Sequence, residues 1–247
     1  MRRAAGFSLV EVIIGMVVGS MVMAGAYSIW LTHQTEGNKL SKKIELRNKL
    51  TLASKKIQKS VTLAGIGLAG SANLSKQDAV GSDTLIVFAN TQERKSGLAS
   101  ATDHHTPVIQ VASPGIFEGA EYIGIAGGGH AELRRVVQVS GTGLQLDTAF
   151  TNDYPVAGTL VFPAERERFY TDQDSSQFIR EASDGAYVVA TDVKNFQISF
   201  ADKHGESTEI PGRIRTVRYS LTGVFPAKAG AISTMIFSST AIPRNTL

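Results

Sequence analysis

Residues 6–31 read GFSLVEVIIGMVVGSMVMAGAYSIWL, and this stretch decides the architecture of the N-terminus. From Phe7 to Leu31 the only charged residue is Glu11. A helix of this length would extend about 37 Å at roughly 1.5 Å per residue, and a bilayer core needs about 20 apolar residues. The stretch therefore predicts a helix that can span a membrane. Before it, Arg2 and Arg3 would stay cytoplasmic by the positive-inside tendency.

Two plainer interpretations of this N-terminus remain open at the level of sequence. A secretory signal peptide has a short apolar core followed by an Ala-x-Ala cleavage site. The present run is longer than such a core, although Ala24-Gly25-Ala26 imitates a late cleavage site. An uncleaved signal anchor fits the length but does not explain Glu11, unless that carboxylate lies at the membrane edge and reaches water. Inside lipid, a carboxylate costs about 2.5–3.5 kcal/mol on insertion scales and usually marks a function.

The string from Gly6 to Glu11, after a short basic leader and before an apolar helix, resembles the type IV prepilin signature. In that family a membrane peptidase cuts after the glycine and N-methylates the new first residue. The resemblance implies cleavage between Gly6 and Phe7, N-methylation of Phe7, and an assembly role for Glu11. It also implies that Glu11 pairs with the terminal amine of a neighbouring subunit. Because an unpaired buried charge costs several kcal/mol, such a pair would set the register between subunits.

Past Leu31 the sequence becomes polar while the helical pattern continues. One face carries Leu46, Leu50, Ala53, Ile57, Val61 and Ala64, spaced as on an amphipathic helix that packs on a sheet. The other faces carry Lys42, Lys43, Arg47, Lys49, Lys55, Lys56 and Lys59. We interpret these cations as a solvated surface, with binding to acidic lipid or DNA as the alternative. The pattern predicts one helix from about Ser8 to Leu63.

Glycines punctuate this predicted helix and end it. Gly15 and Gly19 form a small-xxx-small pair that permits close helix approach in lipid. Local unwinding of the helix where it leaves the membrane is a further expectation, because glycine weakens a helix by about 1 kcal/mol. We expect the helix to end at the cluster of Gly65, Gly67 and Gly70.

Beyond about Gly81 the apolar period changes from helical spacing to two, which is typical of short strands. The predicted strands are Thr84–Ala89, Val108–Val111, Glu121–Ile125, Leu133–Val139, Gly143–Leu146, Thr159–Phe162, Arg168–Thr171, Gln177–Arg180, Tyr187–Ala190, Phe196–Ala201, Thr216–Leu221 and Ile232–Ser238. The polar stretch Thr91–Thr106 is expected to be a mobile loop. The sequence thus predicts an α+β fold of the type IV pilin-like kind, in which one long helix packs on an antiparallel β-rich head. We divide it into a leader (1–6), a transmembrane or filament-core helix (7–31), an amphipathic stem (32–64) and a head (65–247).

The later sequence resembles one pilin subgroup, the PilW-type minor pilins, and the pseudopilin J class of type II secretion shares much of the pattern. The segments that carry this resemblance are Leu63-Ala64-Gly65, Gly81-Ser82-Asp83-Thr84-Leu85, Arg168-Phe169-Tyr170, Phe178-Ile179-Arg180, Val193–Ile198, Arg213–Leu221 and Ile242-Pro243-Arg244-Asn245. The chain departs from many of these proteins in having no cysteine. Disulfides and Cys-ligated metals are therefore excluded.

Charge and composition limit the chemistry of the head. Residues 1–60 hold ten Lys and Arg against three acidic residues, whereas residues 61–247 hold fifteen against nineteen. A mildly acidic head is a poor match to nucleic acid. Four polar groups invite a site: Asp103 with His104-His105, Asp172-x-Asp174 with Ser175-Ser176, Gly127-Gly128-Gly129-His130, and Glu165-Arg166-Glu167-Arg168. We interpret the first group as a polar loop rather than a metal site, and the third as a hairpin turn rather than a phosphate-binding loop. The second group could offer oxygens to calcium, but the EF-hand spacing is missing. The fourth group is interpreted as charge pairing at a sheet edge.

Together these features predict a structural protein with no enzymatic activity, no cofactor and no metal. The resemblance implies a minor pilin that helps initiate or cap a type IV pilus, with possible roles in twitching motility or cell adhesion. Its partners would be other minor pilins, the major pilin, prepilin peptidase, the pilus assembly platform and the inner membrane, with no nucleic acid. The protein would cross the bacterial inner membrane once with its head in the periplasm, and later join a filament at the cell surface. The alternatives are a type II secretion pseudopilin, a filament-displayed adhesin or DNA-uptake module, and a membrane-anchored enzyme.

Overall fold

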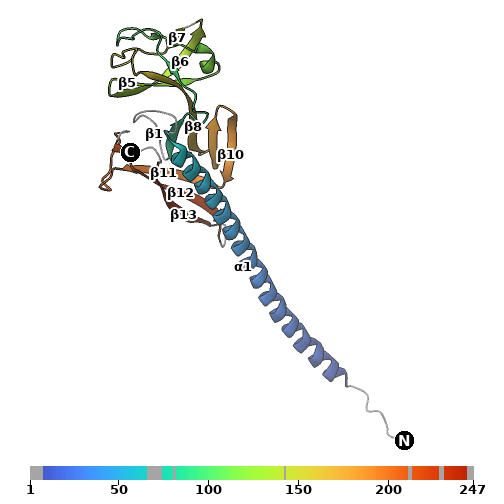
Figure 1. Ribbon diagram of the computed structural model, residues 1–247. Coiled ribbons are helices and arrows are strands. Elements are labelled where there is room, and N and C mark those ends of the chain that lie inside the picture. The colour runs from blue at the N-terminus through green and yellow to red at the C-terminus, as the bar shows by residue number, and fades with distance from the viewer. Residues whose placement is uncertain are drawn as a thin grey trace.

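The computed structural model describes residues 8–65, 74–79, 82–141, 143–210, 213–227 and 231–243. Its dominant element is a single helix, α1 (Leu9–Leu63), which projects from a β-rich head (Figure 1). At about 1.5 Å per residue its 55 residues extend roughly 82 Å. This arrangement confirms the predicted α+β, type IV pilin-like architecture. Several residues singled out in the sequence lie outside the described part: Gly6, Phe7, Gly67, Gly70, Gly81, Arg244 and Asn245.

The helix ends where the glycine cluster begins. Ala64 is the C-cap, and the next residue, Gly65, has a φ of 75°, which suits glycine because it has no Cβ to clash. The Gly65 amide then donates to the Phe88 carbonyl at 2.9 Å, which ties the end of the helix to the sheet. The prediction of an end at Leu63 is confirmed.

The head contains two antiparallel sheets. The strands of the larger sheet are β1 (Leu74–Ala79), β2 (Ser82–Ala89), β3 (Ser96–Gly97), β4 (Val108–Gln110), β5 (Tyr122–Gly127), β6 (His130–Ser140), β7 (Gly143–Leu146), β8 (Leu160–Asp172), β9 (Gln177–Ala182) and β10 (Gly185–Thr191). They follow the order β1-β2-β8-β5-β6-β7-β4, with β3 and β9 also on β8, and β10 on β9. The smaller sheet has the order β11 (Val193–Ala201), β12 (Thr216–Pro226) and β13 (Ile232–Ala241). A 3₁₀ helix, η1 (Pro114–Phe117), lies between β4 and β5.

The predicted strands are present, with one difference in how they are joined and two omissions. Thr159–Phe162 and Arg168–Thr171 were expected as separate strands but are parts of the continuous strand β8. Strand β1 was missed because its sequence, LSKQDA, contains no β-branched or aromatic residue, and its pairing with β2 supplies the order. Strand β3 lies within the expected mobile loop, 91–106, which is also held by the bridge between Thr102 and Tyr154. Such long-range pairing leaves no local signal.

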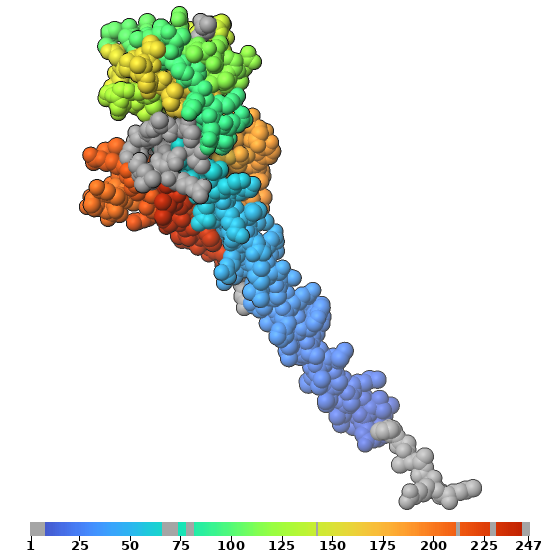
Figure 2. Space-filling model, in the orientation of Figure 1, coloured from blue at the N-terminus to red at the C-terminus, as the bar shows by residue number. Residues whose placement is uncertain are grey.

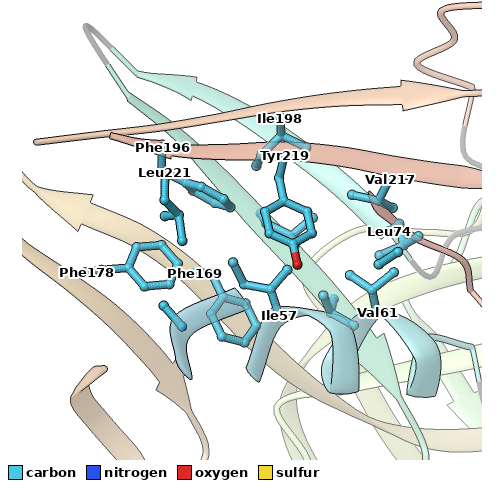
Figure 3. Packing of buried hydrophobic residues seen from close by; sticks show 14 of the residues in the cluster. Ile57, Val61, Leu74, Phe169, Phe178, Phe196, Ile198, Val217, Tyr219 and Leu221 are labelled. Carbon is cyan, nitrogen blue, oxygen red and sulfur yellow. The ribbon is translucent and has the colours of Figure 1, made fainter. Parts of the chain in front are cut away.

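Two separate hydrophobic clusters stabilise the head. The first joins α1 to both sheets and includes Ile57, Phe169, Phe178 and Tyr219, whose side chains meet between helix and strands (Figure 3). The second lies between Leu98 and Val161 and contains no residue of α1. Strand β8 is common to both, because Phe169 belongs to the first cluster and Val161 to the second.

We call residues 90–164 the distal lobe. Its chain leaves β2 after Ala89 and returns at Glu165, and these two residues are paired across the β2–β8 ladder. The lobe is therefore an insertion at the end of one antiparallel pair of strands, with its own hydrophobic cluster. It lies at the end of the molecule farthest from the start of α1 (Figures 1 and 2).

Candidate functional site

The start of α1 is capped by two of its own side chains. Ser8 has extended backbone angles (φ −69°, ψ 144°), and its Oγ accepts a hydrogen bond from the Val10 amide at 3.3 Å. In return, the Ser8 amide donates to Glu11 Oε2 at 3.3 Å, which completes a capping box. The carboxylate of Glu11 thus points back toward the helix start, where the positive end of the helix dipole favours it. The sequence analysis missed this capping role, although Ser8-x-x-Glu11 carries its signal.

Glu11 is exposed in the isolated chain and is the acidic residue of the first turn. The Ser8 amide that it binds is the one next to Phe7 in the chain, and Gly6 and Phe7 themselves lie outside the described residues. A carboxylate held by one backbone amide keeps several oxygen lone pairs free to accept further hydrogen bonds. A cation brought to this end of the helix could therefore bind Glu11 directly.

The following segment of α1 presents an apolar surface that nothing in the described chain covers. Its large apolar side chains are exposed all round the helix, from Leu9 at 79% to Leu31 at 42%. The most apolar window has a mean hydropathy of 2.1, with none of it buried, so by length and composition this helix can cross a membrane. A surface of this kind requires lipid or other apolar helices around it.

No contact within the described chain requires glycine at the three glycine positions of this segment. A Cβ added at Gly15, Gly19 or Gly25 would meet nothing within 4 Å, and α1 continues through all three without a break. The local unwinding expected where the helix leaves the membrane is thus not seen in the isolated chain. Because each glycine costs about 1 kcal/mol of helix stability relative to alanine, these positions fit a close approach by a neighbouring helix.

An aromatic pair ends the apolar segment. Tyr27 and Trp30 stack with ring centroids 5.8 Å apart, and both rings are exposed. One turn later the surface becomes polar, with an ion pair between Glu36 and Lys39 at 3.3 Å. Tyr and Trp concentrate at the membrane–water boundary because one part of each ring is apolar and another can bind water. The sequence analysis did not use this pair, although its spacing of three residues was visible.

The second half of α1 docks on the head as predicted. All six residues of the expected stripe are buried: Leu46, Leu50, Ala53, Ile57, Val61 and Ala64. At the N-terminal end of this docked half, helix and sheet are in close contact, since a Cβ on Gly223 of β12 would lie 2.7 Å from Leu46 Cδ1. At the centre, Ser54 Oγ and the Tyr219 hydroxyl lie 2.7 Å apart, and the hydroxyl donates to the Ser54 carbonyl at 3.1 Å. This buried pair fixes the axial position of the helix, because a shift along the sheet would leave the polar groups unpaired.

Lys49 makes a second polar attachment at the edge of the docked region. Its Nζ binds Glu45 at 2.8 Å, Asp192 at 3.1 Å and Thr191 Oγ1 at 2.9 Å. The hydrogen bond to Glu45, opposed by partial burial and supported by Asp192, raises the pKa of Lys49. The other six cations named in the sequence for the polar faces, such as Lys55 and Lys59, are exposed.

The polar groups singled out in the head form local structure. His104 Nδ1 lies 2.8 Å from Asp153 Oδ1, while Asp103 accepts from the amides of His105 and Thr106. Within the described ranges, no group of three or more His, Cys, Asp or Glu side chains is arranged to hold a metal.

Two of the remaining groups form turns between strands. Gly128 and Gly129 both have positive φ and turn the chain between β5 and β6, which confirms the predicted hairpin. Asp172 accepts from the Asp174 amide and the Ser175 hydroxyl at the β8–β9 turn, and these bonds lower its pKa.

The alternating charges of residues 165–168 form ion pairs, but not at a sheet edge. They lie on β8, which is central and has β2 on one side and β5 and β9 on the other. Arg166 pairs with Glu121 and Glu181 at 3.3 and 3.5 Å, and Glu167 pairs with Arg180. The expectation of an edge was wrong because alternation of charge shows which face a side chain occupies, not which strands lie beside it.

Comparison with known proteins bears on the N-terminus. Residues 1–27 match the family model described as the prokaryotic N-terminal methylation motif. A search of curated proteins found no match. The match includes the capped helix start and most of the exposed apolar segment of α1, and such motifs belong to structural proteins. Together, the methylation motif and the long helix on an antiparallel β head support a type IV pilin-like protein whose N-terminus indicates processing by prepilin peptidase.

Proposed function

We propose that this protein is a minor pilin of the PilW type, which helps to initiate or cap assembly of a type IV pilus. Residues 7–31 would hold it in the inner membrane, with residues 32–64 as stem and 65–247 as a periplasmic head that later reaches the cell surface. The observation that carries the proposal is that the first half of α1 is apolar and exposed, with one carboxylate at its capped start. Partners would be other minor pilins, the major pilin, prepilin peptidase and the assembly platform. No enzymatic activity is part of the proposal.

The proposed assembly step follows from the position of Glu11. Cleavage after Gly6 would create an amine on Phe7, which prepilin peptidase would then N-methylate. Among packed apolar helices the lower effective dielectric strengthens the attraction between that amine and the Glu11 carboxylate of a neighbour. A subunit in the wrong register would leave both charges buried and unpaired, at a cost of several kcal/mol. The pair would therefore select one axial register.

Two related functions share this machinery. A type II secretion pseudopilin would be anchored and assembled in the same way. A display role, as an adhesin or DNA-uptake module, is favoured by one observation: the distal lobe has its own hydrophobic cluster at the end of the molecule farthest from the membrane helix (Figure 2). The lobe carries four Lys and Arg against seven acidic residues, which favours a ligand other than nucleic acid.

Processing is tested by mass spectrometry of the mature protein purified from its own membrane. We expect a chain that begins with N-methyl-Phe7. A chain beginning at Met1, or near Tyr27 after the Ala24-Gly25-Ala26 site, would contradict the proposal.

The role of Glu11 is tested with two substitutions that separate charge from capping. Glu11→Gln keeps an oxygen that can accept from the Ser8 amide, whereas Glu11→Ala removes it. If charge pairing drives assembly, both variants are cleaved but poorly incorporated into filaments. Glu36→Ala, an exposed change farther along α1, serves as the control. Normal incorporation of Glu11→Gln would show that capping is sufficient, and would refute the pairing step.

A further inference from the structure

Strands β10 and β13 each lie at an edge of a sheet. In the described part of the chain, β10 pairs only with β9 and β13 only with β12. Exposed edges normally carry Lys, Pro or inward charges that prevent pairing with another chain. Yet β10 (GAYVVAT) and β13 (ISTMIFSSTA) contain neither a charged residue nor a proline. The β13 edge is also regular, with ten consecutive residues in register with β12.

These two edges lie on either side of α1, at the same level along the helix axis. On one side, Leu46 lies against Gly223, the partner of Met235, and Gln58 donates to Ser239 Oγ at 3.1 Å. On the other side, Lys49 binds Thr191, and Lys59 shares a groove with Asp184 just before β10. Both strands therefore accompany the helix over about residues 46–59. Figure 1 shows β10 on one side of α1 and β13 on the other.

The same contacts fix the direction of each strand. Strand β13 runs with α1, because Met235 lies near Leu46 and Ser239 near Gln58. Strand β10 runs against α1, because its start follows Asp184 near Lys59 and its end, Thr191, binds Lys49. Two copies whose helices stand parallel in one membrane would therefore bring β13 of one beside β10 of the other with opposite directions, as an antiparallel pair requires.

Pairing of β13 with a second β13 is disfavoured by the same geometry. An antiparallel β13–β13 pair would point the two helices in opposite directions, which a single membrane orientation forbids. The contact must then be heterologous, joining different surfaces of two copies, and such contacts repeat into open assemblies.

We propose that β13 of one copy adds as an antiparallel strand to β10 of a second copy of this chain. The inference rests on the proposed function, because it requires both helices in one membrane with the same orientation. A bulge in β10 between Val188 and Ala190 limits its regular register to Gly185–Val188. A strand pairing this short is weak alone and would act together with contacts between the exposed helices of the two copies. Ile236 and Val188, which are 68% and 51% exposed, would be covered by it.

Cysteine crosslinking tests this pairing directly, since the natural chain contains no cysteine. Full-length Val188→Cys would be co-expressed with differently tagged Ile236→Cys or Ser238→Cys, and membranes would be oxidised. Paired strands bring Cα atoms to about 4.5–5.5 Å, within disulfide range. We expect a mixed dimer from at least one combination and its loss when Ile236→Lys accompanies Ser238→Cys. Val137→Cys on the distal lobe, where the native side chain is 61% exposed, replaces Val188→Cys as the control and should yield no dimer.

The outcomes separate this inference from the proposed function. Dimers that form as readily between two Val188→Cys or two Ile236→Cys chains would overturn the heterologous pairing, as would a crosslink to another protein alone. Absence of any mixed dimer, in protein that begins with N-methyl-Phe7, would overturn the inference and leave the proposed function standing. Protein that begins at Met1 would contradict the proposed function, whatever the crosslinking shows.

Discussion

Replacing Ile57 with alanine should weaken the docking of the stem on the head without disturbing the distal lobe. Ile57 is fully buried at the centre of the first cluster, where it points from α1 toward the strands (Figure 3). Loss of a buried Ile side chain to Ala costs about 2–5 kcal/mol, lowered by a few tenths because alanine favours helix. A domain is stable by only about 5–15 kcal/mol, so the loss is a large share. Ile57 is not a member of the second hydrophobic cluster.

Hydrogen exchange of the full-length protein in detergent, read by mass spectrometry, can resolve the two clusters. The free energy of opening should fall for the amides of β12 and stay unchanged for those of β5 and β6. The control is Leu52→Ala on the same helix, where the side chain is 53% exposed and the change should be within about 0.5 kcal/mol. An equal fall in both sets of strands would show that the head unfolds as one unit, and an equal effect of Leu52→Ala would refute the docking argument.

Three further predictions follow from named contacts. Tyr219→Phe leaves Ser54 Oγ buried without its partner and should lower the free energy of unfolding in urea by about 1–3 kcal/mol, whereas adding Ser54→Ala should restore part of it. Burial opposes ionisation of Glu132, but bonds from the Thr151 amide and Asn152, with Arg134, lower its pKa. The ionised Glu132 carboxylate therefore stabilises the folded state above its unfolded-state pKa, about 4.3. This stabilisation is lost as the pH falls below that value, through the lower pKa of the folded state. Glu132→Gln should flatten this acid dependence of distal-lobe exchange, and an unchanged profile would contradict it. Replacing residues 91–164 by a short glycine turn should leave the helix-bearing cluster folded, because residues 89 and 165 are already paired. Loss of protection in β12 of this deletion variant would refute it.

Helical periodicity was the most informative part of the sequence. The stripe from Leu46 to Ala64 could be placed without a structure, because only one helix face repeats at that spacing and only burial explains apolar residues there. Most strands were likewise visible from their period of two. Strands β1 and β3 were not, because one has a polar sequence and the other contains two residues, and both are ordered by partners distant in the chain.

Other features depended on which segments meet in space. The charges of β8 were recognisable as pairs, yet only the sheet order placed them at its centre. No local pattern indicated that residues 90–164 form a hydrophobic cluster of their own. Strands show the same alternation of apolar residues whether they share one core or are divided between two. The opposite directions of β10 and β13 beside α1 likewise follow from contacts between residues more than a hundred positions apart, such as Lys49 with Thr191.

The sequence by itself determined that this protein has a long N-terminal helix, apolar enough to span a membrane and with one carboxylate near its start, because hydropathy, charge and helical period are local properties of the chain. Only the tertiary structure decided how that helix is held, which strand edges flank it, and that the head is divided between two hydrophobic clusters. Those features arise from packing between distant segments, and the free energy of such packing depends on shape and partners that no single stretch of sequence contains.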